Sequence, residues 1–401
     1  MTTSDARVRQ VLAAAERLAP ELDALSRRIH AHPEVGFAEV QAAAWLADYL
    51  GAHGHAVERE AGGVATAFRA ILDVGDAVGG RGPTVALLAE YDALPGIGHG
   101  CGHNLIAAAA AGAGALLHAV DDGRLAGRVQ VIGTPAEEGG GGKVALLDAG
   151  VFRGVDAALM VHPLSRTRIH ESLLGRSKLT VEFFGKPAHA AAYPDEGVNA
   201  LDAMVLHLSG ISAMRQQLRP QARVHGIVTH GGDAPNIIPE HTAAVFYVRA
   251  LDRDYLRELV RRFETCAQGA AQATGTRAAV TAEPFLYEPM RASRTLSGRF
   301  RAHLAAAGVE EDPPPPRPPL ASSDVGNVSQ ALPTIHPWIG ILPPGEPDVP
   351  IHTREFRDAA ATDHAHRRMR AAACALALTA LDVLGDPACL AAAREEFERG
   401  D

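Results

Sequence analysis

The chain has 401 residues, of which 47% are hydrophobic and 21% are charged, the balance of an ordinary globular protein. Its net charge of −9, without blocks of basic residues, argues against a nucleic acid or an anionic membrane as its partner. Four cysteines without framework spacing, and the absence of a signal-peptide pattern or a membrane-length apolar run, predict a cytoplasmic protein.

Helix and strand signals alternate in the first part of the chain. Helices are expected over 4–32, which ends before a proline, and over 37–51, which ends on a glycine. Further strands and helices are expected at 84–89, 104–121, 128–132, 142–149 and 157–161. The strand-length runs are almost continuously apolar, as in strands covered on both faces. The alternation predicts an α/β layered sandwich.

The pattern of predicted strands and helices changes at Lys178. From there the expected order is strand 178–184, helix 197–218, strands 223–231 and 241–250, helix 253–273 and strand 277–282. This split β-α-β-β-α-β order is the ferredoxin-like pattern, so the segment is predicted to be a compact insertion in the larger domain. The larger domain then resumes, with a helix at 293–307, strands near 333–342 and a last helix at 358–384.

The strongest local signal for chemistry is a glycine-rich turn after the strand at 84–89. It reads GlyIleGlyHisGlyCysGlyHisAsn over 96–104, and it places Cys101 and His103 just before a helix. Reactive groups gather beyond the carboxyl ends of strands in open α/β sheets, and a thiolate with an imidazole suits a divalent metal. A small buried cysteine beside a hydrogen-bonded histidine is the alternative for this triplet taken alone.

A pair of carboxylates follows the next strand. The segment GlyThrProAlaGluGlu ends on Glu137 and Glu138 and precedes four glycines. One carboxylate can bind a metal while the other serves as a general base, which is the division that metal-assisted hydrolysis needs. An acidic loop exposed to water is the alternative for a pair of glutamates taken alone.

Two histidines complete the candidate set. His162 follows the strand at 157–161, and His352 comes late, after a proline-rich approach. Three successive strands therefore bring cysteine, histidine and glutamate side chains to the same edge of the predicted sheet, which favours one shared metal site. Other histidines are left out of the predicted metal site. His30 and His32 are interpreted as structural or surface residues, and His364 and His366 as residues of a solvated helix among arginines; the histidines without partners at useful spacing are His53, His55, His225 and His230.

With these motifs, the sequence resembles the aminoacylase/hippuricase family of dinuclear metallopeptidases. Its closest resemblance is to the branch with p-aminobenzoyl-glutamate hydrolase and the aminoacylase-like dipeptidases. The matching segments are 32–39, 101–104, 323–329, 334–337 and 352–356. Asn104 departs from the aspartate of hippuricases and auxin-conjugate hydrolases, which argues against hippurate or plant-hormone substrates.

The resemblance implies the fold and the metal site. It implies an α/β fold, in which a three-layer metallopeptidase catalytic domain with a mixed sheet comprises 1–176 and 287–401, and a ferredoxin-like α+β lid comprises 177–286. It implies two divalent ions, zinc or manganese, with Cys101 between them and Glu137 as the general base. The implied metal ligands are Cys101, His103, Glu138, His162 and His352.

The resemblance also implies roles for three residues of the inserted domain. His189, in LysProAlaHisAlaAla, would stabilise the oxyanion of the tetrahedral intermediate, and Asn236 would help to bind the substrate. Arg249 would bind a free carboxylate of the substrate, with a surface strand arginine as the alternative. In relatives this domain also supports dimerisation, so a homodimer through the lid is expected.

The predicted activity is a metal-dependent amidohydrolase or carboxypeptidase that cleaves the amide bond of an N-acyl or aminoacyl amino acid, a small-molecule substrate. Deamination or another non-peptidic C–N hydrolysis at the same metal centre is one alternative. A non-catalytic relative that binds a ligand is another, although it predicts a lost ligand or base. A single structural zinc site is a fourth reading, but two carboxylates in a glycine-rich loop do not fit it.

Overall fold

The computed structural model describes residues 3–75, 82–170, 172–315 and 320–400. It divides into two compact units, each described by itself below. The larger unit comprises Met1–Ser172, Arg291–Pro319 and Asn327–Asp401, and the smaller unit comprises Leu173–Met290 and Leu320–Gly326. The assignment of metal binding to one predicted domain and of a lid to the other stays a prediction.

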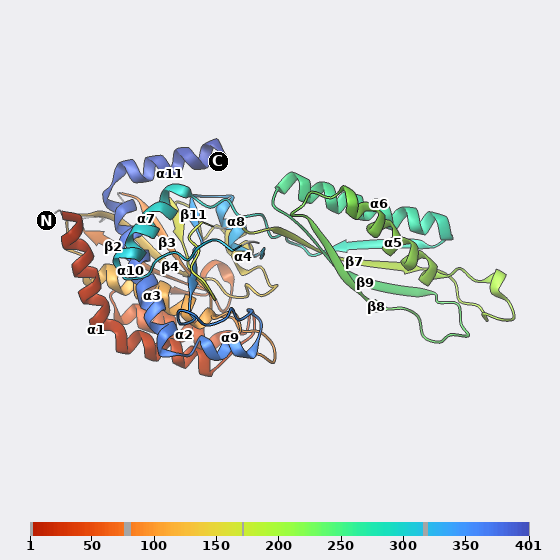
Figure 1. The fold of residues 1–401 in the computed structure, drawn as a ribbon, viewed down its shortest axis with the longest axis horizontal. Coiled ribbons are helices and arrows are strands. Elements are labelled where there is room, and N and C mark those ends of the chain that lie inside the picture. The colour runs from red at the N-terminus through yellow and green to blue at the C-terminus, as the bar shows by residue number, and fades with distance from the viewer. Residues whose placement is uncertain (1–2, 76–81, 171, 316–319, 401) are drawn as a thin grey trace. The chain divides into compact units, whose positions relative to one another are not determined.

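The larger unit is built on a mixed sheet, which has six strands within the described residues, in the order β1-β2-β4-β3-β5-β11 (Figure 1). Its strands are β1 (Ala56–Arg59), β2 (Phe68–Gly75), β3 (Thr84–Ala89), β4 (Ala126–Gly133), β5 (Ala157–Leu159) and β11 (Thr334–Ile335). β3 runs parallel to both β4 and β5, so the carboxyl ends of these three strands meet at one edge. A separate parallel pair joins β6 (His162–Leu164) to β12 (Trp338–Gly340).

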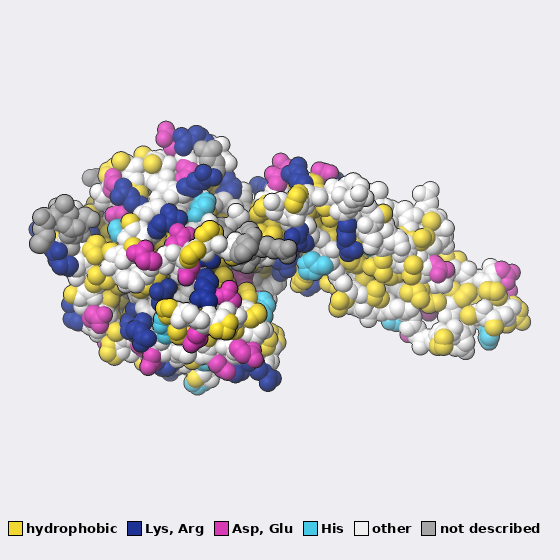
Figure 2. Space-filling view, viewed as in Figure 1, with side chains coloured by type: hydrophobic (Ala, Val, Ile, Leu, Met, Phe, Trp, Pro, Cys, Tyr) yellow, Lys and Arg dark blue, Asp and Glu magenta, His cyan; other side chains and the backbone are white. Residues whose placement is uncertain are grey.

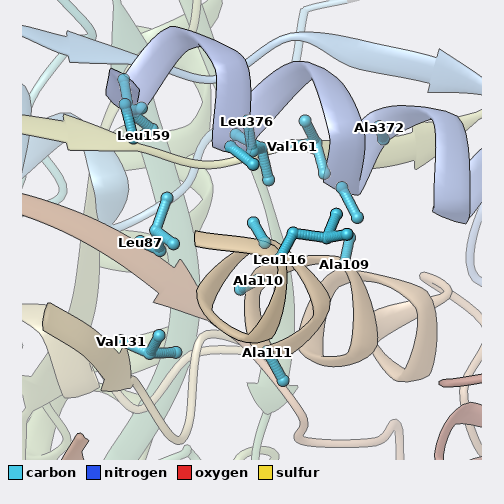
Figure 3. Close-up of a cluster of buried hydrophobic side chains, with 14 of the residues drawn as sticks. Leu87, Ala109, Ala110, Ala111, Leu116, Val131, Leu159, Val161, Ala372 and Leu376 are labelled. Atoms are coloured by element: carbon cyan, nitrogen blue, oxygen red, sulfur yellow. The ribbon is translucent and has the colours of Figure 1, made fainter. Parts of the chain in front are cut away.

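Helix α3 (His103–Ala119) packs on β3 and β4 and along α10 (Asp363–Gly385), which itself contacts the same strands. Figure 3 shows Ala109 and Leu116 of α3 among side chains of the strands and of α10. An added Cβ at Gly114 would lie 2.7 Å from a methyl carbon of Val131 in β4, so the small residues of α3 allow a close approach to the sheet. The remaining helices are α1 (Thr3–Ala31), α2 (Val40–Ala52), α4 (Gly142–Asp148), α7 (Arg294–Ala306), α8 (Val325–Ser329), α9 (Arg354–Ala359) and α11 (Pro387–Arg399).

The smaller unit is an antiparallel sheet, which has four strands within the described residues, in the order β10-β7-β9-β8, with two helices packed on it. Its elements are β7 (Gly175–Phe184), α5 (Ala200–Met214), β8 (Arg223–His230), β9 (His241–Ala250), α6 (Arg253–Thr274) and β10 (Arg277–Ala282). Alternate residues of β7 are buried under α5 and α6, as a sheet covered on one face requires. Asp252 caps α6 by accepting the Tyr255 backbone N–H at 2.8 Å.

The predicted fold class is confirmed: the larger unit has a mixed central sheet with helices, and the smaller unit has a separate antiparallel sheet with ferredoxin-like strand order. Some predicted elements differ. The last predicted helix, 358–384, is broken between α9 and α10, where the Thr362 hydroxyl caps a new helix. Strands β1 and β2 and helix α11 were not predicted.

His366 corrects one prediction, because it is buried in α10 and its Nδ1 donates to the Thr362 carbonyl at 2.7 Å. It is therefore not a surface residue. Within the described ranges, no single helix is long and apolar enough to cross a bilayer, although α10 and α11 taken together, bent by 96°, pass that test.

Candidate metal centre

The residues of the candidate centre lie just beyond the ends of the central strands. Asp92 follows β3, the turn before α3 carries Cys101, and α3 begins at His103. The adjacent glutamates Glu137 and Glu138 follow β4. These groups meet because β3 and β4 are parallel neighbours, which brings their carboxyl ends to one edge.

His162 and His352 reach the same edge from elsewhere in the chain. His162 is the first residue of β6, and the backbone N–H of His352 donates to the Gly100 carbonyl at 2.9 Å. That bond ties the His352 turn, in which φ is +66°, to the glycine-rich loop. His352 Nε2 lies 3.4 Å from Glu138 Oε1.

The structure brings all six of these predicted residues together in overlapping groups. In each group, one nitrogen, sulfur or carboxylate oxygen per residue lies within 4.8 Å of the others. The groups are Cys101, His103 and His162; Cys101, Glu138 and His352; and His103, Glu137 and Glu138. Cys101, His103 and Glu138 each belong to two of the three groups, so the groups form one continuous cluster.

Unpaired buried atoms support a metal here. His103 Nε2 and Glu138 Oε1 are buried and have no hydrogen-bond partner among the described residues, which is rare for polar atoms inside proteins. The Nδ1 of His162 donates to the Pro163 carbonyl at 2.8 Å, which leaves its Nε2 lone pair for a ligand. Thiolate, imidazole and carboxylate together suit zinc or manganese. The residues present therefore fit a metal centre.

Asp92 connects two of the candidate ligands. It accepts a hydrogen bond from His103 Nδ1 at 3.0 Å and another from the backbone N–H of Glu138 at 2.9 Å. Burial opposes its ionisation, but the His103 charge and hydrogen bond lower the pKa of Asp92 overall. Burial would likewise lower the pKa of His103, yet Asp92 raises it well above its usual range. Burial, and after it the neighbouring Glu138 carboxylate, raise the pKa of the Cys101 thiol well above its usual range, so a cation would be needed to stabilise its thiolate.

The turn that presents the two glutamates is held by Glu39. Ala136 has a φ of +56°, which is uncommon for a residue other than glycine, and its N–H donates to Glu39 Oε1 at 2.8 Å. Glu39 is fully buried, and burial raises its pKa to about 7. The 32–39 motif thus contributes to the site by shaping the backbone before Glu137.

Besides Asp92 and Glu39, sequence reasoning missed three further residues at the centre. His336 is buried, its ring centroid lies 5.5 Å from that of His162, and neither of its ring nitrogens bonds another described residue. Glu90 and Lys143 form a fully buried ion pair beside His103. The signal available for His336 was its position in ThrIleHisPro after an apolar strand; a lysine among glycines gave no comparable signal.

His189 and Asn236 lie together in the smaller unit. The backbone N–H of Ala190 donates to the Asn236 carbonyl at 3.0 Å, and His189 forms an isolated antiparallel β-bridge with Ile237. The Nδ1 of His189 accepts from the backbone N–H groups of Ala191 and Ala192 at 3.3 and 3.2 Å. The proton of a neutral His189 therefore sits on Nε2, which makes the exposed end of the ring a hydrogen-bond donor.

Arg249 lies in a half-buried setting near the far end of β9. Its Nη1 donates to the Ser322 hydroxyl at 3.0 Å, and its guanidinium lies 5.3 Å from the ring centroid of Tyr247. Burial lowers the pKa of Arg249, and the nearby Arg176 lowers it further. Its Nε has no hydrogen-bond partner and it forms no ion pair among the described residues, so it has donors to offer an anion.

The structure does not bring Arg249 and His189 together within one chain. In the register of β7 and β9, Arg249 lies opposite Arg176 at one end of the pair, and His241 lies opposite Phe184 at the other end. His189 follows Phe184 by five residues in the chain. The eight residue-to-residue steps from His241 to Arg249 span about 26 Å of extended strand. One small substrate therefore cannot contact both residues of the same chain.

Known proteins resemble this chain along most of its length. Residues 172–274 match a family model described as a peptidase dimerisation domain. The Xaa-Arg dipeptidase of Mus musculus is 40% identical, covering 96% of this chain and 91% of that protein. The Xaa-Arg dipeptidase of Homo sapiens is 37% identical, covering 96% and 90%. One chain of the p-aminobenzoyl-glutamate hydrolase of Escherichia coli is 35% identical, over 63% of this chain and 55% of that protein.

Solved structures share the fold. A dinuclear metal binding peptidase of Bacillus subtilis from the M20 family has a TM-score of 0.66 at 20% identity, covering 89% of this chain and 98% of that one. An aminobenzoyl-glutamate utilization protein of Klebsiella pneumoniae has a TM-score of 0.67 at 21% identity, covering 91% and 98%.

Proposed function

This chain belongs to the M20 peptidase family of hydrolases, and on that premise we propose that it is a dipeptidase with two divalent cations that releases the C-terminal amino acid of its substrate. The observation that carries the proposal is the cluster of ligand atoms beside the Glu137 carboxylate at the carboxyl edge of the sheet. The proposed ligands are Cys101, His103, Glu138, His162 and His352.

The proposed chemistry is hydrolysis of a peptide or related amide bond. When bound, the cations would polarise the scissile carbonyl and lower the pKa of the attacking water. Glu137 accepts the proton of that water and returns it to the leaving amine. Asp92 fixes the orientation of His103, and the Glu39 hydrogen bond to Ala136 fixes the backbone from which Glu137 projects.

The proposed substrates are dipeptides with a basic C-terminal residue. Two relatives that each cover 96% of this chain bear the name Xaa-Arg dipeptidase. Arg249 binds the free carboxylate of the released amino acid, because its guanidinium offers donors and has no carboxylate partner among the described residues. Arg176 is a second positive charge next to Arg249 and further lowers the pKa of Arg249. A substrate carboxylate bound to Arg249 would offset this repulsion.

We propose a homodimer in which His189 and Asn236 act in the partner's site. The edge strand β8 exposes Ile227 and Val228, and α5 exposes Val205, Leu206 and Leu208. Figure 2 shows hydrophobic side chains gathered on the surface of this unit. An edge strand with apolar side chains invites pairing with a second copy. The separation of His189 from Arg249 supports a site that takes these two residues from different chains.

A second candidate substrate is an acyl-glutamate such as p-aminobenzoyl-glutamate, on the likeness to the Escherichia coli hydrolase. Both substrates carry a carboxylate for Arg249, so the pocket for the side chain of the released amino acid would decide between them.

We propose the cytoplasm as the compartment, since all four cysteines are free.

The test is amino acid release from a panel of substrates. The panel contains dipeptides ending in arginine, lysine, glutamate and leucine, N-acyl amino acids and p-aminobenzoyl-glutamate. The enzyme is stripped with chelator and refilled with zinc or manganese, and Glu137→Gln serves as the inactive control. Metal-dependent release of arginine or lysine is expected. Release of glutamate alone would support the second candidate, and no release despite two bound ions would favour deamination or another non-peptidic reaction.

A further inference from the structure

A buried ion pair stands next to the candidate metal ligands. Lys143, in the first turn of α4, donates to Glu90 Oε1, and both side chains are fully buried. The other carboxylate oxygen, Glu90 Oε2, lies 3.7 Å from Nε2 of His103. Glu90 thus links the lysine to the ring nitrogen that would face a cation.

Stability of the fold does not explain this pair. Removing a lysine and a glutamate from water costs free energy that their mutual attraction often fails to recover, so an apolar pair would serve a core equally well. We therefore look for a role of these two charges other than stabilising the fold. Here the nearest candidate use is the centre that His103 belongs to.

Lys143 is a positive charge among several negative ones at the centre. The carboxylates of Glu90, Asp92, Glu137 and Glu138 carry four negative charges, and Cys101 adds a fifth when it binds a metal as a thiolate. Removing either Lys143 or Glu90 therefore changes the net charge that divalent cations would meet here. Glu39 lies one step further out, bonded to the Ala136 amide rather than to a ligand.

We infer that the Glu90–Lys143 pair sets the affinity of the centre for divalent cations, with Lys143 lowering it and Glu90 raising it. The inference rests on the proposed two-metal centre and deepens it. Lys143 also occupies Glu90 Oε1, which holds this carboxylate beside His103 as a neighbouring charge. The pair is a positioning and charge-setting device and does not touch the substrate.

The inference predicts effects of opposite sign from the two partners. Lys143→Met removes a positive charge next to the centre, so the centre binds zinc about tenfold or more tightly than the wild type. Glu90→Gln removes a negative charge beside His103, so zinc binding weakens by about tenfold or more. The double variant returns close to the wild-type affinity. A merely structural ion pair would instead weaken metal binding in both single variants.

The experiment measures zinc affinity by competition with a chelator, and metal per chain by elemental analysis, in the full-length protein. The rise in melting temperature on adding zinc is measured beside it, and it should be larger in Lys143→Met and smaller in Glu90→Gln than in the wild type. Lys143→Gln removes the same positive charge but keeps a polar group at the end of the side chain. It replaces Lys143→Met in these measurements if the methionine variant does not fold. The matched control is Arg370→Met, which breaks the 2.6 Å ion pair to Asp23 between α10 and α1; it should leave zinc affinity unchanged.

The outcomes separate two failures. If the wild type binds two ions and both single variants shift affinity in the same direction, or neither shifts it, this inference is wrong and the proposed function stands. If the wild type binds no zinc or manganese, the proposed metal centre itself fails.

Discussion

The Nδ1 of His103 donates to Oδ1 of Asp92 across 3.0 Å, and both side chains are almost completely buried. This contact fixes the tautomer of His103 and turns its Nε2 toward the other ligand groups. A carboxylate behind a ligating histidine also raises its basicity. We therefore expect Asp92 to affect how tightly the centre holds a metal, although it is not among the candidate ligands.

Asp92→Asn is expected to reduce zinc affinity by about 10- to 100-fold, the usual effect of removing a carboxylate behind a histidine ligand. Chelator competition measures the change. Asp73→Asn is the control, since Asp73 pairs with Arg128 at the surface, at 2.7 Å. Equal affinity in the Asp92 variant and the wild type would show that the contact does not serve the metal.

Glu137→Gln is expected to keep two metals per chain and to lose about 10²–10⁴-fold in kcat, because glutamine cannot accept the proton of the attacking water. Metal analysis and turnover on the best dipeptide check both halves. Turnover near that of the wild type would remove Glu137 from the role of general base.

Arg249→Met is expected to raise KM for substrates with a free C-terminal carboxylate by about 10- to 100-fold, the loss of a charge-assisted hydrogen bond. Arg249→Lys should recover part of this loss. C-terminally amidated dipeptides provide the control, because wild type and variant should handle them equally poorly. If the variant lost the same factor on amidated and free substrates, Arg249 would not be the carboxylate site.

His189→Ala and Glu137→Gln are each expected to be nearly inactive, yet co-expression of the two chains should restore about a quarter of wild-type activity if the subunits mix at random. The mixed dimer has one site with an intact Glu137 and the partner's His189. Fractions are separated by two affinity tags and assayed for release of the amino acid. An inactive mixed dimer would place His189 in the site of its own chain.

Glu396→Gln is expected to lower the free energy of unfolding at pH 7 by about 1–3 kcal/mol. Glu396 accepts hydrogen bonds from Ser293 and from the backbone N–H groups of Arg294 and Thr295 at the start of α7. Burial opposes its ionisation, but the backbone bonds lower its pKa below the ordinary 4.5.

Because the folded pKa is lowered, the stability from Glu396 is complete above pH 4.5 and is lost as the pH falls through the folded value. The gap between wild type and variant in urea unfolding should therefore close in acid. A gap that stays constant from pH 7 to pH 3 would mean that the charge of Glu396 has no part in it.

Much of the candidate site could be predicted because its residues follow recognisable strands. Cys101, Glu138 and His162 each come just after an apolar run, and parallel strands end at one edge. His336 also follows such a run, yet a single histidine there carries no local signal of a neighbouring ligand. Its importance shows only from its burial and from the His162 ring beside it.

The sequence by itself determined the fold class, the order of the elements in the smaller unit and the candidate ligands, since hydrophobic periodicity and short motifs are local properties of the chain. Only the tertiary structure decided which groups support them. Lys143 meets Glu90 across 53 residues, and Glu39 meets Ala136 across 97. Such pairings depend on how helices and loops pack onto the sheet, and on the cost of burying a polar group without a partner. Neither the packing nor this cost can be predicted from the spacing of residues along the chain.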